Sequence, residues 1–273
     1  MILRSSMLVL FLGFIGEEMN AQVKKIKTSS GSKKHKQELK MKIEIWSDVA
    51  CPFCYIGKHK LDSAIQSFPE LANVKVEWKS FQLDPDIASS ALGITEYLSQ
   101  RKGMSVASVA QMIENVKYMG AQSGLDLNFE KVIIANSFKA HRLLHFAKEK
   151  GLQHETEEAL FEAHFTHGKN ISDDQDLIEA AMKVGLDKSE AEAILKSNKY
   201  TDEVAQDIKE ASELKIQGVP FFIFNRKYAV SGAQDVSVFK KVLRTSYDEW
   251  QKDSKKELEV IEGKVCTPEK KCN

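Results

Sequence analysis

The spacing of apolar and polar residues from residue 42 onward predicts the first regular elements of the chain. The run Lys42-Ile43-Glu44-Ile45-Trp46 alternates between polar and apolar side chains, which predicts a strand. Residues 52–68 carry apolar side chains at helical spacing, and residues 74–81 alternate again. We therefore expect a strand, a helix and a second strand in that order, the unit that forms a parallel strand pair.

Helical periodicity replaces this pattern in the middle of the chain. Between about residues 94 and 214 the apolar positions recur at helical spacing, interrupted by Gly120, Gly151, Gly168 and Gly185. Two short apolar runs, Phe221–Phe224 and Tyr228–Val230, then predict strands joined by a tight turn, and residues 235–250 predict a closing helix.

This order of elements predicts an α/β fold that is split in sequence. Residues 41–90 and 215–250 are expected to form one domain around a sheet, and residues 91–214 an inserted all-helical domain. Residues 251–273 are expected to form a C-terminal tail.

The tetrapeptide Cys51-Pro52-Phe53-Cys54 falls between the first predicted strand and helix. A Cys-x-x-Cys pair at this place is typical of thiol–disulfide chemistry. Cys51 would lie at the helix N-terminus, where unpaired N–H groups and the helix dipole favour a thiolate. Pro52 suits the first helical turn, and Cys54 follows one turn on. We therefore interpret Cys51 as the attacking thiol and Cys54 as the resolving thiol.

Two further cysteines, Cys266 and Cys272, lie close together in the tail. Their Cys-x5-Cys spacing is not usual for a zinc ribbon, so we favour redox chemistry at Cys51 over metal binding and predict no metal site. The tail pair is a candidate second redox pair that exchanges electrons with Cys51 and Cys54. The alternative is a structural or reactive pair whose short loop adds little stability.

The dipeptide Val219-Pro220 directly precedes the apolar run that starts at Phe221. Most X-Pro bonds are trans, but a proline at a strand start can also be cis and leaves the neighbouring backbone free to pair with an extended peptide. We therefore expect Val219 and Pro220 to hold a substrate backbone beside Cys51.

Five segments together resemble one known group of proteins, the DsbA-like FrnE group of thioredoxin-fold oxidoreductases. The segments are Ser47–Gly57, Phe81–Pro85, Asn136–Arg142, Gly218–Phe222 and Tyr228–Gln234, within a region of resemblance from Met41 to Leu243.

The resemblance implies a thioredoxin fold with a helical insertion, a Cys-x-x-Cys active site and a cis-proline at Pro220. It also implies a protein disulfide oxidoreductase or isomerase that exchanges disulfides with protein or small-molecule thiols. Pro52 and Phe53 would contact the substrate, and His141 would line the cleft between the domains. No cofactor is implied, and glutathione is a candidate redox partner.

Relatives in the wider superfamily suggest the main alternative. The kappa-class glutathione transferases and 2-hydroxychromene-2-carboxylate isomerases look similar but place serine at the first active-site position and use glutathione. A glutathione-dependent isomerase or transferase would have an apolar pocket in its helical domain. A third alternative is a binding protein without redox activity. Neither explains why Cys54 is present as well as Cys51.

Composition narrows the partners. The 273 residues contain 39 lysines and arginines and 39 aspartates and glutamates, so no charge bias points to nucleic acid. The longest apolar run, residues 7–15, is too short to span a membrane. The oligomeric state and the physiological substrate stay open.

Residues 1–40 are interpreted either as a signal peptide or as a disordered basic extension. The apolar run at residues 7–15 is typical of a signal peptide and would imply export to a compartment such as the periplasm. Glu17, however, falls where a cleavage region needs small uncharged residues. Because the resemblance starts at Met41, we favour a cytoplasmic protein.

Other charged residues are given ordinary roles. The acidic run Glu155-Thr156-Glu157-Glu158 is interpreted as a solvated helix face. Asp48 is expected to cap a turn before Cys51, although a carboxylate there could also accept a proton from a thiol. His141 and His145 have a spacing that suits metal ligands, as do His164 and His167, but no carboxylate joins them in a metal motif.

Overall fold

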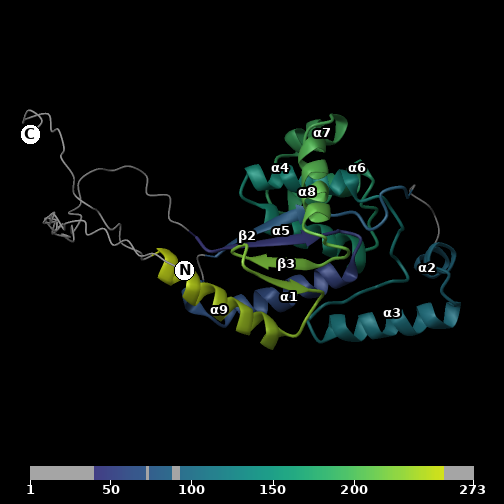
Figure 1. The fold of residues 1–273 in the computed structure, drawn as a ribbon. Helices are drawn as coiled ribbons and strands as arrows, with labels where there is room; N and C mark the ends of the chain where they lie inside the picture. The colour runs from purple at the N-terminus through teal and green to yellow at the C-terminus, as the bar shows by residue number, and fades with distance from the viewer. Residues whose placement is uncertain (1–39, 72–73, 88–92, 255–273) are drawn as a thin grey trace, which may run out of the picture. The chain divides into compact units, whose positions relative to one another are not determined.

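The structure, a computed structural model, describes residues 40–71, 74–87 and 93–254 (Figure 1). All but the last residue of the predicted extension 1–40 lies outside these ranges, as do Cys266 and Cys272. Within the described ranges, no helix is long and apolar enough to cross a membrane.

The described residues form four strands and a series of helices. The strands are β1 (Lys42–Ser47), β2 (Lys75–Ser80), β3 (Phe221–Phe224) and β4 (Tyr228–Ser231). The helices are α1 (Pro52–Gln66), α2 (Ile94–Lys102), α3 (Val106–Ala121), α4 (Phe138–Glu149), α5 (Gln153–Phe161), α6 (Asp174–Lys183), α7 (Lys188–Lys196), α8 (Thr201–Glu213) and α9 (Val236–Ser254), with a short 3₁₀ helix η1 (Pro69–Leu71) and a π-helical turn η2 (Glu162–Thr166).

The sheet joins strands from the two ends of the described chain. Its order is β2-β1-β3-β4, with β1 parallel to β2 and antiparallel to β3. Ile45 of the central strand β1 lies between Trp78 on one side and Phe222 on the other. The predicted β–α–β unit and the predicted hairpin are therefore both present, in one mixed sheet.

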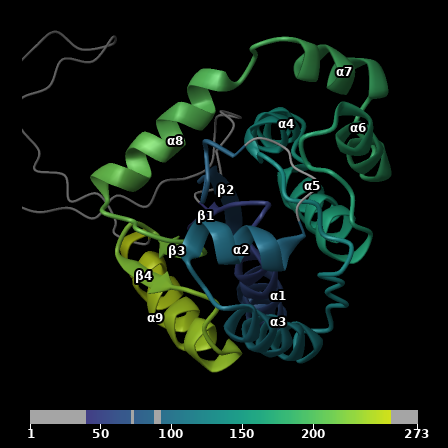
Figure 2. The same cartoon turned by 90° about the vertical axis from the view of Figure 1, so that its right-hand side faces the viewer.

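Helices cover both faces of this sheet, α1 and α9 on one side and α5 and α8 on the other (Figures 1 and 2). On the first side, Leu61 of α1, Phe222 of β3 and Phe239 of α9 are fully buried together. On the second, the indole N–H of Trp46 donates to the backbone oxygen of Asp207 in α8 at 3.0 Å. Because both faces are covered, β1 is buried along nearly its whole length.

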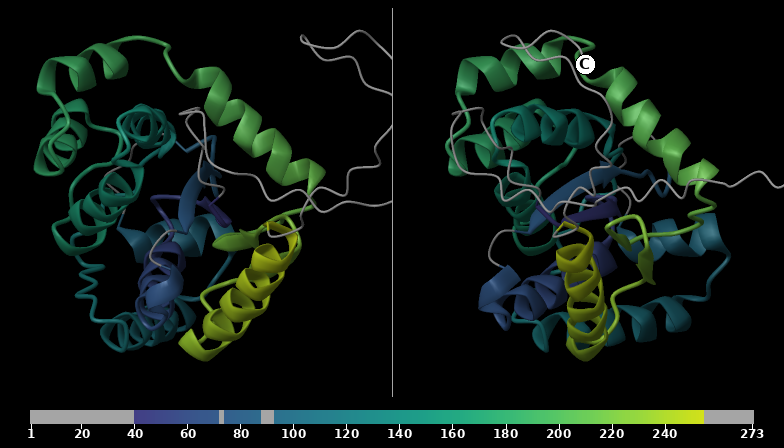
Figure 3. Two further views of the ribbon diagram at one scale, coloured as in Figure 1. Left: turned by 90° about the vertical axis from the view of Figure 1, so that its left-hand side faces the viewer. Right: turned by 60° about the vertical axis from the view of Figure 1, so that its left-hand side comes forward.

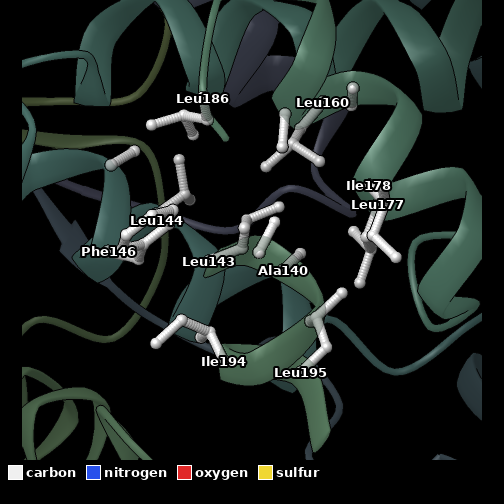
Figure 4. Close-up of a cluster of buried hydrophobic side chains, with 14 of the residues drawn as sticks. Ala140, Leu143, Leu144, Phe146, Leu160, Leu177, Ile178, Leu186, Ile194 and Leu195 are labelled. Carbon is white, nitrogen blue, oxygen red and sulfur yellow. The ribbon is translucent and has the colours of Figure 1, made fainter. Parts of the chain in front are cut away.

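The inserted helices have an apolar core of their own. Leu143 and Leu144 of α4 pack there against Leu160, Leu177 and other side chains from α5, α6 and α7 (Figure 4). Helix α8 then leads from the end of α7 back to the sheet (Figure 3). The limits predicted for the two domains, at residues 90 and 214, stay predictions.

One feature of the insertion agrees with the sequence analysis and one differs from it. The break expected at Gly120 falls at the end of α3, whose last residue is Ala121, and a glycine is needed there because an added Cβ would be 2.6 Å from Leu127 Cδ1. Residues 122–137 form no helix or strand, although helices were expected throughout the insertion. This stretch instead runs past the cysteine pair and contributes to the pocket beside it.

Candidate active site

Cys51 occupies the N-cap of α1, with an extended backbone (φ −102°, ψ 112°), and Pro52 follows in the first turn. The Cys51 backbone oxygen accepts from the N–H of Cys54 at 3.0 Å, and the Cys51 N–H donates to Asp48 O at 2.9 Å. The tight turn after β1 therefore sets the first cysteine at the helix N-terminus, where the sequence analysis expected it.

The two cysteines differ in their environments. Cys51 is 3% exposed and lines a pocket, whereas Cys54 is fully buried beneath it. Burial, together with the neighbouring Cys51, raises the pKa of the Cys54 thiol well above its ordinary value. The backbone of Asp48 and the side chain of Ser47 lower this pKa, but by less. Burial therefore favours the thiol form of Cys54 and shields it from solvent, whereas Cys51 lines the pocket.

Val219 and Pro220 lie against Cys51, as the resemblance implied. Their peptide bond is cis, and the Cys51 Sγ lies 3.8 Å from the Val219 backbone oxygen. Gly57 of α1 allows this approach, since an added Cβ would be 3.1 Å from Pro220 Cγ and 3.0 Å from Phe222 Cζ. Two segments 168 residues apart in the chain thus meet at one sulfur.

Asp48 and His141 form a buried pair behind the cysteine motif. The Asp48 Oδ1 lies 3.5 Å from His141 Nε2, and both side chains are nearly inaccessible. Burial alone would raise the pKa of Asp48, but His141 and the N–H of Leu83 lower it on balance. Burial likewise opposes protonation of His141, yet Asp48 raises its pKa. The pair is therefore best described as a carboxylate beside an imidazolium.

Asp48 also organises the loop around Cys51. Its carboxylate accepts from the backbone N–H of Ala50 at 3.1 Å and of Leu83 at 2.7 Å. Asp48 therefore caps the turn before Cys51, as expected, and its bond to Leu83 also holds the loop after β2. His141 does not line the apolar pocket beside Cys51. It is buried behind the cysteines, where it contacts Asp48.

Glu157 is a buried acid on the same side of the motif. It is 0% exposed, and its Oε1 accepts from the Ser47 hydroxyl at 2.8 Å while Oε2 has no partner. Burial raises the pKa of Glu157 to about 7, although His141, Ser47 and Lys58 each oppose that shift. The prediction of a solvated acidic face is wrong here, because α5 packs Thr156 and Glu157 against the sheet side and leaves Glu155 exposed.

Ser47 therefore stands between a buried thiol and a buried acid. It interacts with Cys54 and donates to Glu157. Above about pH 7, where Glu157 is ionised, a proton leaving Cys54 can pass to the Ser47 hydroxyl as the hydroxyl proton moves to the Glu157 carboxylate. The arrangement places a proton acceptor near the buried Cys54 thiol without exposing that thiol to water.

Replacing Glu157 by glutamine should change how stability depends on pH. The folded protein keeps the Glu157 proton up to about pH 7, whereas the unfolded chain loses it near its ordinary pKa of 4.5. The free energy of unfolding of the native protein should therefore fall by about 3 kcal/mol between pH 4.5 and 7 through this group. Glu157→Gln should lack this loss and be more stable above pH 7.

Urea unfolding at pH 5 and pH 8 checks this expectation. Glu155→Gln is the matched control, since Glu155 is exposed on the same helix and should change little at either pH. A Glu157→Gln protein that is equally less stable at both pH values would contradict a protonated Glu157.

An apolar pocket of about 260 Å³ opens beside Cys51. Pro52 and Phe53 line it from the motif, Met112, Ile113 and Val116 from α3, and residues 132–135 from the non-helical stretch. A second, more polar hollow is also lined by Phe53 and runs along Val219 and Pro220. Cys51 lines the apolar pocket and not the polar hollow.

The histidine pairs considered for metal binding contact different partners. His145 lies 3.1 Å from Asp207 and 3.2 Å from the Ser80 hydroxyl, while its neighbour His141 contacts Asp48. His164 is buried and lines the pocket beside Cys51, and His167 is paired with Glu162 on the surface. No group of three or more metal-binding side chains occurs among the residues that the structure describes.

A mixed four-stranded sheet with helices on both faces, a Cys-x-x-Cys pair at a helix N-terminus and a cis-proline beside it define a thioredoxin-like fold. The DSBA-like thioredoxin domain, as a family model, matches residues 42–244. The chain therefore belongs to the DSBA-like thioredoxin family, with a helical insertion in the fold.

Individual proteins agree with this family. YwbO, an uncharacterized protein of Bacillus subtilis strain 168, is 31% identical over 203 residues, covering 74% of this chain and 94% of YwbO. The crystal structure of SCO1869 of Streptomyces coelicolor, a probable DsbA oxidoreductase, matches this structure with a TM-score of 0.74. The two chains are 36% identical, and the match covers 85% of this chain and 98% of SCO1869. The cytosolic disulfide reductase DsbM of Pseudomonas aeruginosa, at 15% identity and a TM-score of 0.56, covers 76% of this chain and 99% of its own and shares the fold alone.

Proposed function

We propose that this protein is a thiol–disulfide oxidoreductase of the FrnE group, with Cys51 as the nucleophile and Cys54 as the resolving thiol. The observation that carries the proposal is the difference between the two cysteines. Cys51 lines a pocket at a helix N-terminus, while Cys54 is buried one turn on beside Ser47. This asymmetry suits attack by one thiol and resolution by the other.

The exchange would proceed in two steps. The Cys51 thiolate attacks one sulfur of a substrate disulfide, and the other substrate sulfur leaves as a thiolate. Cys54 then gives up its proton by way of Ser47 and attacks the Cys51 sulfur, releasing the second substrate thiolate and leaving a Cys51–Cys54 disulfide. Val219 and Pro220 would hold the substrate beside Cys51, and Asp48 with His141 would hold the loop that carries it. Run backwards, the same steps oxidise a substrate dithiol.

The direction of exchange depends on the reduction potential, which for such pairs spans about −270 to −120 mV. A cytoplasmic location would favour the reductase or isomerase direction, and export would favour oxidation. We propose that the protein is cytoplasmic, the location expected because the resemblance starts at Met41.

An equilibrium titration against glutathione tests the proposal. The full chain is incubated at a series of ratios of reduced to oxidised glutathione, and the Cys51 and Cys54 thiols are counted by alkylation and peptide mass spectrometry. We expect one reversible two-electron transition, with both thiols disappearing together. Independent titration of the two thiols, or stable glutathionylation of Cys51 without a Cys51–Cys54 bond, would overturn it.

A second candidate is a glutathione-dependent isomerase or transferase that acts on small molecules. The apolar pocket beside Cys51 favours it, since that alternative required a pocket of this kind. It predicts saturable binding of reduced glutathione to the Cys51→Ser, Cys54→Ser double variant, measured by calorimetry. The oxidoreductase does not require such binding.

A further inference from the structure

The surroundings of the Cys51 sulfur determine which disulfides can contact it. Cys51 is 3% exposed, so a substrate disulfide must enter the hollow that Cys51 lines. That hollow is the apolar pocket, while the polar hollow along Val219 and Pro220 does not include Cys51. The flat face of a folded protein cannot enter a recess of this kind, whereas a small disulfide or an extended peptide segment can.

Most of the charges in the pocket are already compensated. Asp48 is paired with His141, and Asp84 is held by Arg101 at 2.6 Å and by the Tyr97 hydroxyl at 2.8 Å. His164 is neutral near pH 7, because burial lowers its pKa to about 4. Lys102, the remaining charged residue of the lining, is exposed to solvent. A ligand that carried carboxylates into the buried part of this lining would lose their hydration without gaining an ion pair.

The size of the pocket limits the ligand as well. Its volume of about 260 Å³ is slightly below the range of roughly 300–1,000 Å³ that is usual for drug-sized molecules. The lining from Met112, Ile113, Val116 and Ile134 is apolar. The pocket therefore suits one ring or a short alkyl chain.

We infer that this pocket receives the apolar half of a small neutral disulfide, aromatic or alkyl, and presents its sulfur to Cys51. The inference rests on the thiol–disulfide exchange proposed above and names its substrate class. The pocket discriminates by apolar contact, so charged disulfides such as oxidised glutathione are poorer substrates than neutral apolar ones.

The reaction balances with the protein and the disulfide alone. The Cys51 thiolate attacks the sulfur held in the pocket, a Cys51–sulfur bond forms, and the outer half leaves as a thiolate. Cys54 attacks Cys51, the half in the pocket leaves as a second thiolate, and the two thiolates take up the protons lost by Cys51 and Cys54. The disulfide gains two electrons and the cysteine pair loses two.

Single-turnover kinetics of the pre-reduced full chain test this inference. Cys266→Ser and Cys272→Ser are introduced so that Cys51 and Cys54 alone react. The probes are dithiodipyridine, which is neutral and aromatic, and hydroxyethyl disulfide, which is neutral and polar. We expect the rate with dithiodipyridine to saturate with concentration, and the rate with hydroxyethyl disulfide to rise linearly.

Substitutions at Met112 separate apolar contact from other causes. Met112→Gln keeps the length of the side chain and should raise the half-saturating concentration of dithiodipyridine about tenfold, whereas Met112→Leu should change it less than about twofold. Met182→Gln, at a half-exposed methionine on α6, is the matched control and should have no effect. Ile113→Trp, which fills the pocket, is a second variant should Met112→Gln fold poorly, as judged by its melting temperature.

Each outcome has a definite meaning. Saturation that Met112→Gln weakens for dithiodipyridine alone supports the inference. Linear kinetics with both probes, or equal slowing of both by Met112→Gln, overturns it while leaving the exchange function intact. If Ile113→Trp slows insulin reduction as much as it slows the reaction with dithiodipyridine, the inference is overturned, and the pocket binds a peptide side chain instead. Failure of both probes to oxidise Cys51 and Cys54 overturns the proposed function itself.

Discussion

Cys51→Ser is expected to abolish disulfide exchange, and Cys54→Ser to stop the reaction at a mixed disulfide. Cys51 is the cysteine that lines the pocket, whereas Cys54 is fully buried and its pKa is raised by that burial. Without Cys51, no thiol among the described residues lines the pocket. Without Cys54, the bond between Cys51 and the substrate forms but has no internal thiol to resolve it.

Insulin reduction and intact-mass spectrometry separate these outcomes. Cys51→Ser should show no activity and no adduct, and Cys54→Ser should accumulate one substrate adduct that peptide mapping locates at Cys51. The double variant Cys266→Ser, Cys272→Ser is the control, and it also tests the predicted relay to the tail pair, which lies outside the described residues. Undiminished insulin reduction by Cys51→Ser would contradict the oxidoreductase.

Asp48→Ala should be the most damaging substitution for stability near the site. It removes the counter-charge of a buried histidine and leaves the N–H groups of Ala50 and Leu83 without their acceptor. Breaking a buried ion pair from one side costs about 3–5 kcal/mol. Asp48→Asn keeps an acceptor but not the charge, and should lose about 1–3 kcal/mol.

The cost of Asp48→Ala should depend on pH. The lowered pKa of Asp48 stabilises the fold above its ordinary value near 4, and that contribution disappears as the pH falls further. The raised pKa of His141 stabilises the fold below its ordinary value of 6.5, and that contribution disappears as the pH rises through the raised value. The difference between native and variant proteins should therefore be largest between about pH 4 and 6.5.

Urea unfolding across this range measures the effect. Asp86→Ala is the matched control, because Asp86 is exposed, and it should change stability by less than about 0.5 kcal/mol. A loss in Asp48→Ala no larger than in Asp86→Ala would contradict the buried pair.

The sequence was sufficient for the parts of the site that depend on local pattern. Alternation at residues 42–46 predicted β1, and the Cys-x-x-Cys directly after it predicted a cysteine at the start of α1. The expectation that Val219 and Pro220 lie beside Cys51 rested on the chemistry of a proline at a strand start and on the resemblance, since nothing local links segments 168 residues apart.

The parts that the sequence did not reveal depend on packing. Glu157 falls in an acidic run that suits a solvated helix, and only the docking of α5 against the sheet side buries it beside Ser47. Its spacing with Thr156, Leu160 and Phe161 on one buried helix face was the available signal. The pocket wall at residues 132–135 was not predicted. Periodicity alone does not distinguish a short apolar stretch without regular structure from part of a helix.

The order of strands in the sheet has a consequence for protein synthesis. Cys51 and Cys54 leave the ribosome early, but β3, the neighbour of β1, and Val219 beside it follow 168 residues later. At a synthesis rate of about 5–20 residues per second, both thiols wait roughly 10 to 30 s for that neighbour. A chain that stops before β3 carries the cysteine motif without its sheet partner, so a finished active site marks a chain translated at least to residue 224.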